Sequence, residues 1–136
     1  YGMFVTAFYV TIDVHNRLLT YGSAGHNDQL LIKKNGRQAV HLNASGRALG
    51  LSAESTYEER VYIYEPGDLL LLFTDGVLDY LGEGDIDRGE ERLIEIANRH
   101  FDEDPSAIIA RFSDLISNNA VDNYFLDDFT ILSVKF

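Results

Sequence analysis

The sequence predicts an α+β fold, with antiparallel strands first, two long helices after them and one last strand. Three observations predict it. Short apolar or alternating segments, separated by turn residues, fill the chain as far as Asp75. Apolar residues then recur with helical spacing up to Asn119. A final apolar segment over residues 129–136 returns to the pattern of a strand.

Six segments before Asp75 have the composition or the alternation of strands. They are residues 3–13, 18–23, 30–32, 38–42, 58–64 and 69–73. The first is apolar on both faces, which predicts a buried strand. Asn35-Gly36 is a strong hairpin signal between the third and the fourth. The run Leu69 to Phe73 is wholly apolar and predicts a central strand that is covered on both sides.

The helical part begins after Asp75-Gly76 with a short predicted helix over residues 76–81. Residues 82–89 are rich in glycine and acidic side chains and predict a mobile acidic loop. Apolar residues at helical spacing then predict an amphipathic helix over residues 93–101. Pro105 is suited to the first turn of a second long helix, which Asn118 and Asn119 end.

The composition bounds what the protein does. The 136 residues suit one domain, and 22 acidic against 11 basic side chains give a net charge of −11. This charge argues against nucleic acid or an anionic membrane surface as the main partner. Without cysteine there is no thiol nucleophile and no zinc–thiolate site. There is also no run of eighteen apolar residues. The cysteine-free sequence fits a reducing cytoplasm, where we expect the protein to act.

Two acidic positions lie at predicted strand ends. Asp75 follows the apolar strand directly, and Asp127-Asp128 precedes the last strand. If these two strands are antiparallel neighbours, Asp75 and Asp127 lie close together and offer hard oxygen ligands for Mg²⁺ or Mn²⁺. The alternative is that Asp75 begins a turn or caps the short helix, and that Asp128 is a turn residue. Spacing alone does not separate the two.

His26 lies in a loop of small residues, Ala24-Gly25-His26-Asn27, between two predicted strands. It could position a phosphate or a water near the acidic site. From the sequence alone, an exposed histidine in a hairpin loop is the favoured interpretation.

Six blocks, in order, resemble those of bacterial metal-dependent protein serine/threonine phosphatases of the SpoIIE/RsbU type, which are related to protein phosphatase 2C. The blocks are Phe4-Val5-Thr6-Ala7-Phe8-Tyr9, Ala24-Gly25-His26, Ala48-Leu49-Gly50-Leu51, residues 66–77 from Pro66 to Val77, Gly89-Glu90-Glu91-Arg92-Leu93 and Asp127-Asp128-Phe129-Thr130. The resemblance covers essentially the whole chain. It implies that residues 1–136 are the C-terminal portion of such a phosphatase domain.

The resemblance implies an αββα sandwich of two antiparallel sheets, with an active site at one edge that holds two Mn²⁺ or Mg²⁺ ions. By position, Asp75 and Asp127 match metal ligands of the family. Asp128 and Gly76 match positions beside them, and His26 lies near the site. The family's reaction is hydrolysis of phosphoserine or phosphothreonine by a metal-activated water, without a phosphoenzyme.

The resemblance also suggests partners. They are a phosphoprotein substrate, such as a phosphorylated anti-sigma-factor antagonist, and an N-terminal sensor or receiver domain in the parent chain. No residues here match the family's upstream metal-binding blocks, and Tyr1 opens almost directly onto a predicted strand. We therefore expect the N-terminal part of the fold to lie outside this sequence, and the isolated chain to be weakly active or inactive. Open sheet edges would favour a homodimer, strand swapping or aggregation.

Two other hypotheses about the function stay open. A non-catalytic, phosphatase-like binding module would dock a protein partner and need no complete metal site. A plain β-rich scaffold with surface acids would be favoured if Asp75 and Asp127 proved to lie far apart.

Overall fold

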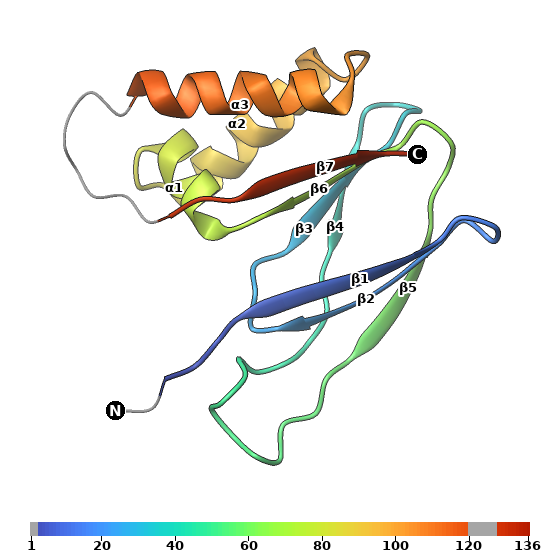
Figure 1. Cartoon of the computed structure of the whole chain (residues 1–136), viewed down its shortest axis with the longest axis vertical. Helices are drawn as coiled ribbons and strands as arrows, with labels where there is room; N and C mark the ends of the chain where they lie inside the picture. The colour runs from blue at the N-terminus through green and yellow to red at the C-terminus, as the bar shows by residue number, and fades with distance from the viewer. Residues whose placement is uncertain (1–2, 120–127) are drawn as a thin grey trace.

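The computed structural model describes residues 3–119 and 128–136, which form two antiparallel sheets and three helices (Figure 1). The three-stranded sheet has the order β1-β2-β5, and the four-stranded sheet has the order β4-β3-β6-β7. The strands are β1 (Ala7–Asp13), β2 (Leu18–Ala24), β3 (Gln29–Ile32), β4 (Ala39–Leu42), β5 (Glu59–Ile63), β6 (Leu69–Phe73) and β7 (Ile131–Lys135). The helices are α1 (Asp75–Gly82), α2 (Ile86–Arg99) and α3 (Pro105–Asn119). The predicted α+β class is confirmed.

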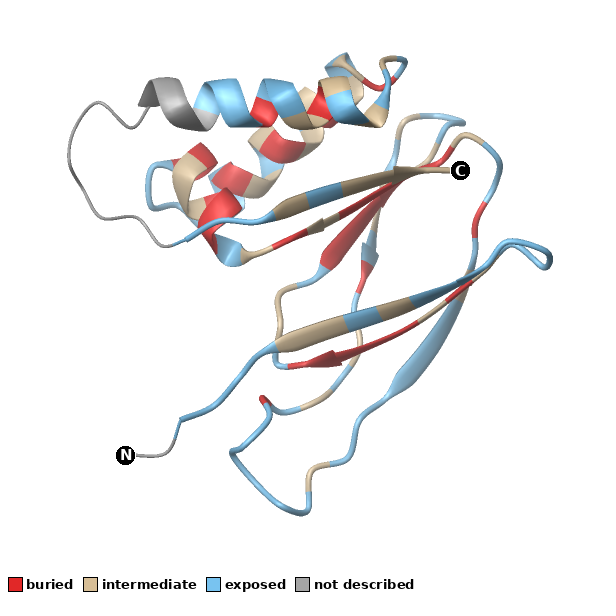
Figure 2. Ribbon diagram, in the orientation of Figure 1, coloured by how far each residue is buried: buried red, intermediate tan, exposed pale blue. Residues whose placement is uncertain are grey.

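The four-stranded sheet is covered on both faces, as the apolar run of β6 predicts (Figure 2). Leu69, Leu71 and Phe73 pack against side chains of all three helices. Leu70, on the opposite face of β6, packs against Leu19 and Tyr21 of the other sheet. Alternate side chains of β6 therefore belong to two separate hydrophobic cores, one on each side of the sheet.

The three-stranded sheet is covered on one face by the described residues. Phe8, Tyr21 and Tyr62 face the core between the sheets. Val61 and Ile63 of β5 face the other way and are exposed. No described helix lies over this outer face (Figure 1).

The prediction of a buried first strand over residues 3–13 was wrong in two respects. Strand β1 begins only at Ala7, and Val5 forms an isolated bridge with Leu49. Most of β1 is half-buried or exposed, because it pairs with β2 alone among the described strands and nothing described covers its outer face. Apolar residues on both faces of a segment therefore did not signal burial here.

The predicted mobile acidic loop over residues 82–89 was also partly wrong. Helix α2 begins at Ile86, and the Asp85 carboxylate accepts a hydrogen bond from the Arg88 N–H at 3.1 Å, as an N-cap residue does. Gly89 is buried within this first turn. The helix predicted over residues 93–101 is confirmed but starts seven residues earlier, and it ends at Arg99.

The two remaining helices agree closely with the sequence. Helix α1 begins and ends within a residue of its predicted bounds, and α3 begins at Pro105 and ends at Asn119. Within the described ranges, no helix has both the length and the apolar character that crossing a bilayer requires.

Candidate functional site

Asp75 stands where the central strand β6 passes into helix α1. Its side chain is exposed, and its Oδ1 accepts a hydrogen bond from the Gly76 N–H at 3.1 Å. Gly76 is buried directly behind it. The first turn of α1 also places Asp75 at the positive end of the helix dipole. Asp75 is thus a rigidly held carboxylate that forms no ion pair with a described residue.

Strand β7 is the antiparallel neighbour of the strand that ends before this carboxylate, which was the condition for a site at this position. Strands β6 and β7 are antiparallel, and Phe73 pairs with Ile131. The Thr74 N–H donates to the Thr130 carbonyl at 3.0 Å, and the Thr130 N–H donates to Thr74 Oγ1 at 2.9 Å. The chain before β7 therefore runs alongside the start of α1.

The second predicted ligand, Asp127, lies outside the described residues, so its distance from Asp75 stays a prediction. Asp128 is described and exposed. Next to it, Phe129 makes an edge-to-face contact with Tyr80 of α1, with ring centroids 5.4 Å apart. This contact fixes the entry of β7 against the helix that carries Asp75.

His26 belongs to the same end of the sheets. Its Nε2 is 3.2 Å from the Phe73 carbonyl oxygen, and its Nδ1 is 3.2 Å from Thr6 Oγ1. A carbonyl oxygen only accepts hydrogen bonds, so Nε2 is the donor to Phe73, while Nδ1 lies within hydrogen-bond distance of the threonine hydroxyl. The interpretation of His26 as an exposed loop histidine was wrong, because the ring is half-buried and both of its nitrogens are engaged. This arrangement suits a residue that positions the strand end better than one that transfers protons.

Two further side chains hold Phe73, and the sequence analysis missed both. Gln29 is buried, receives the Phe73 N–H at 2.6 Å and donates to the Phe73 carbonyl at 3.1 Å. Asn27 donates to the same carbonyl at 3.3 Å. The available signal was a single amide at the start of an otherwise apolar strand, Gln29 to Ile32. Together with His26, these residues fix the end of β6 two positions before Asp75.

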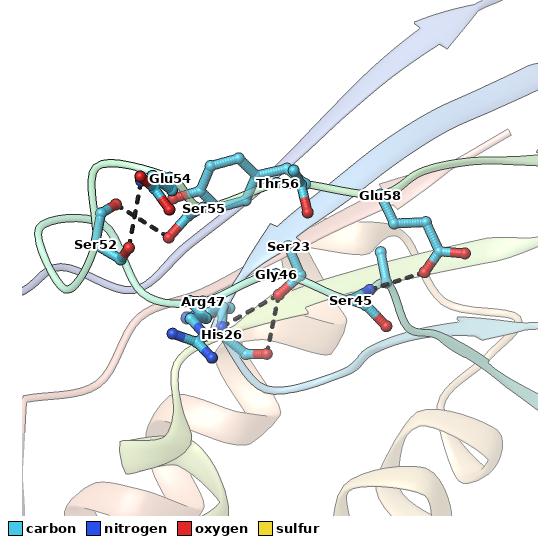
Figure 3. A pocket seen from close by; sticks show the side chains of 13 residues that line it. Ser23, His26, Ser45, Gly46, Arg47, Ser52, Glu54, Ser55, Thr56 and Glu58 are labelled. Carbon is cyan, nitrogen blue, oxygen red and sulfur yellow. Dashed lines mark hydrogen bonds between the residues drawn. The ribbon is translucent and has the colours of Figure 1, made fainter.

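A polar hollow of about 890 Å³ opens beside His26, between the loop after β2 and residues 44–58 (Figure 3). Its wall carries the hydroxyl side chains of Ser45, Ser52, Ser55 and Thr56, together with three charged residues: Arg47, Glu54 and Glu58. The residue segment 44–58 lies close against β2, since a Cβ at Gly46 would come within 2.1 Å of the Ser23 carbonyl oxygen.

Glu58 is the best-anchored charge in this wall. Its carboxylate pairs with Arg60 at 2.9 Å and accepts the Ser45 N–H at 2.9 Å. The hydrogen bond with Arg60, followed by that from Ser45, holds the pKa of Glu58 below its ordinary value. Glu58 is therefore ionised near neutral pH, and its negative charge is paired with Arg60.

The donor chemistry at Asp75 fits a hard divalent cation. Mg²⁺ and Mn²⁺ prefer carboxylate oxygens, and this carboxylate is exposed, rigid and not engaged by a basic side chain of the described residues. Residues 3–119 and 128–136 do not by themselves bring together three histidine or carboxylate side chains at ligand spacing.

Comparisons with known proteins identify what the chain is similar to. The sequence profile of the family described as "Stage II sporulation protein E (SpoIIE)" matches residues 1–136. Phosphoserine phosphatase RsbU of Bacillus subtilis is 29% identical over 136 residues, covering 98% of this chain and 39% of that protein. Protein IcfG of Synechocystis is 32% identical over 100 residues, covering 74% of this chain and 16% of that protein. The chain thus spans well under half the length of these curated relatives.

Solved structures show the same fold. The phosphatase domain of SpoIIE from Bacillus subtilis, presoaked with manganese, superposes with a TM-score of 0.73 at 18% identity, covering 96% of this chain and 55% of that one. The SiaA-PP2C domain of Pseudomonas aeruginosa superposes with a TM-score of 0.76 at 22% identity, covering 96% of this chain and 51% of that one. At these identities the likeness concerns the fold.

Proposed function

Because the chain belongs to the SpoIIE family, we propose that it is the C-terminal portion of a metal-dependent phosphatase domain that hydrolyses phosphoserine or phosphothreonine on a regulatory protein. The observation that carries the proposal is the position of Asp75. It is an exposed carboxylate just after β6, a central strand with four of its five residues buried, and β7 pairs with that strand. The similarity to a phosphoserine phosphatase over 98% of the chain supports the same reaction.

The residues of this chain have distinct roles in the proposal. Asp75, with Asp127 from the segment before β7, would hold a Mn²⁺ or Mg²⁺ ion. Such ions supply a Lewis acid for the phosphoryl oxygens and an activated water for in-line attack on phosphorus. Gly76 lets α1 start tightly beside Asp75, with Asp128 as a supporting residue. His26 keeps the Phe73 carbonyl in place, so that Asp75 cannot drift when a charged ligand arrives.

The finer parts of the proposal concern partners. The family suggests a substrate such as a phosphorylated anti-sigma-factor antagonist, and a sensor or receiver domain elsewhere in the same polypeptide. A homodimer is supported by four strands, β1, β5, β4 and β7, that end the described sheets. The cytoplasmic location rests on the cysteine-free sequence alone.

A second candidate is a phosphatase-like module that binds a protein partner without catalysis. It is favoured by one observation, that the described residues alone do not assemble a three-ligand ion site. In that case Asp75 would serve only as the first residue of helix α1.

Hydrolysis of p-nitrophenyl phosphate by the full-length gene product, with Mn²⁺ or Mg²⁺ added, separates the two candidates. The proposal predicts metal-dependent activity that falls at least about 100-fold in Asp75→Asn, since losing a direct ligand costs more than losing an outer partner. Asp79→Asn, four residues along α1, is the matched control and keeps the activity. Absence of activity with both metals, in the wild type and in Asp75→Asn alike, would favour the binding module instead. Metal-dependent activity that is equal in the wild type and Asp75→Asn would contradict the role of Asp75 as a ligand. The isolated chain 1–136 is expected to be weakly active or inactive in the same assay.

A further inference from the structure

The polar hollow between the loop after β2 and residues 44–58 adjoins the proposed active site. His26 lines this hollow and also lines a smaller cavity formed by Phe73, Thr74 and Thr130 at the strand ends. Thr74 is the residue before Asp75. A ligand that reaches Asp75 through the smaller cavity can therefore extend past His26 into the hollow.

Arg47 lines this hollow and is a basic residue that forms no ion pair with the described residues. Seven of the 11 lysines and arginines form ion pairs with described carboxylates. Arg47 is exposed and forms neither a hydrogen bond nor an ion pair with any described residue, although acidic residues outnumber basic ones two to one. A guanidinium presents a planar array of donors that matches carboxylate and phosphate oxygens.

The two ends of the hollow differ in charge. Figure 3 shows Ser52, Glu54 and Ser55 grouped away from Arg47. Glu58 cannot neutralise Arg47, because its carboxylate is bound by Arg60 and Ser45. The end that carries Arg47 is therefore basic, and the end near Glu54 is acidic.

An apolar hollow of about 260 Å³ lies next to the polar one and shares Ser23 and Tyr57 with it. Tyr9 and Leu49 also line it, and both are exposed. A basic end, a hydroxyl-rich wall and an apolar neighbour together suit an extended peptide segment better than a small anion.

From this arrangement, and resting on the proposed phosphatase function, we infer that the hollow binds the segment of the protein substrate that flanks the phosphoserine. Arg47 is the specificity-determining residue and pairs with an acidic side chain of that segment. The substrates selected in this way carry an acidic residue close to the phosphoserine.

The test uses the full-length protein and two synthetic phosphoserine peptides. The peptides differ at two positions, two residues before and two residues after the phosphoserine, where one has aspartate and the other has alanine. We expect the wild type to have a higher kcat/KM for the aspartate peptide, with the difference in KM. In Arg47→Gln this preference falls about tenfold, the size expected for one charged hydrogen-bonded contact. Arg47→Lys keeps the charge and recovers part of the preference. Arg17→Gln changes a second exposed arginine without an ion pair to a described residue, in the β1–β2 turn, and retains the full preference.

Each other outcome overturns the inference. Equal kcat/KM for the two peptides in the wild type would mean that the hollow does not select acidic flanks. An equal loss for both peptides in Arg47→Gln would mean that Arg47 acts on the phosphoryl group itself. Hydrolysis of p-nitrophenyl phosphate without hydrolysis of either peptide would refute recognition of a linear segment while leaving the phosphatase function intact. Lack of activity on all three compounds would refute the phosphatase function, and the inference with it.

Discussion

The two sheets of the molecule are made from similar strands but differ in how far they are covered by other elements. The four-stranded sheet lies between the helices and the other sheet, and β3 is buried at every position. In the three-stranded sheet, β5 has one half-buried residue and four exposed ones. The proposed metal ligand Asp75 follows β6 of the four-stranded sheet. The wall of the polar hollow is the connection from β4 to β5, and it lies against β2 of the three-stranded sheet. The difference teaches that the proposed ligand stands on the sheet that is covered on both faces, whereas the hollow lies against the sheet that the described residues cover on one face.

The largest expected effect on stability is in the covered sheet. Leu71 of β6 is fully buried against the helices, so Leu71→Ala is predicted to lower the free energy of unfolding by about 4 kcal/mol. Urea denaturation of the purified protein measures this loss. A loss below about 1 kcal/mol would mean that the helices do not pack tightly on the sheet.

The next effect comes from a buried ion pair at the start of β6. The Asp68 side chain is fully buried, receives Lys33 Nζ at 2.6 Å and accepts the N–H groups of Glu65 and Lys34 at 2.9 and 2.8 Å. Asp68→Ala removes the nearer carboxylate of the largely buried Lys33 and leaves it only Glu65, at 3.6 Å, so a loss of about 3 kcal/mol at pH 7 is expected in the same denaturation experiment. Asp114→Ala, on the exposed surface of α3, is the control and changes little.

The same carboxylate predicts the dependence of stability on pH. Burial opposes the ionisation of Asp68, but the hydrogen bonds from Lys33, Glu65 and Lys34 outweigh it, so its pKa lies below the ordinary value of 3.8. A lowered pKa in the folded state stabilises the fold above the ordinary value and loses this effect as the pH falls through the lowered one. The difference in stability between wild type and Asp68→Ala should therefore shrink as the pH is lowered below about 4. A difference that stays constant between pH 7 and pH 2 would contradict the assignment.

A smaller effect is expected where α1 crosses α2. A Cβ at Gly89 would stand 2.1 Å from the Leu78 carbonyl oxygen, so Gly89→Ala must push the two helices apart at a cost of about 2 kcal/mol. Because α1 carries Asp75, we expect phosphatase activity to fall as well. Glu91→Ala, exposed on the same helix, should affect neither quantity. Unchanged stability in Gly89→Ala would show that the helices have room at their contact.

The smallest effect is expected on the outer face of the three-stranded sheet. Ile63 of β5 is 67% exposed, and Ile63→Ser should change the free energy of unfolding by less than about 0.5 kcal/mol. This prediction sharpens the comparison between the sheets. A loss above about 1.5 kcal/mol in the full-length protein would show that another part of the protein covers this face.

Much of the fold could be read from the sequence, because local patterns decided it. The apolar run of β6, the hairpin at Asn35-Gly36 and the helix start at Pro105 were all predicted correctly. The pairing of β6 with β7 was the condition on which the closeness of Asp75 to the last strand depended, and the structure meets it. The strand, the hairpin and the helix start depend on period and turn chemistry, which are local in the sequence.

The errors concern long-range packing. Alternation in β5 gave its period but not which face points to the core, and the structure partly buries Tyr62 while exposing Val61 and Ile63. The acidic, glycine-containing stretch before Leu93 looked like a loop, because Gly89 is unfavourable in an isolated helix. In the folded protein Gly89 permits the close approach of α1, a requirement that only the partner helix reveals. Gln29 was missed for the same reason, since its hydrogen bonds join it to Phe73, 44 residues away.

The most direct test of the central claim is the binding of Mn²⁺ to the full-length protein by isothermal titration calorimetry, with wild type, Asp75→Asn and Asp79→Asn compared. If the carboxylate at the end of β6 holds the ion, Asp75→Asn weakens Mn²⁺ binding at least tenfold. Tenfold is the smallest loss of affinity expected even for a residue that only supports a metal ligand. Asp79→Asn leaves the affinity unchanged. Equal affinity in all three proteins would contradict the account, because the rigid end of the covered sheet would then hold no metal.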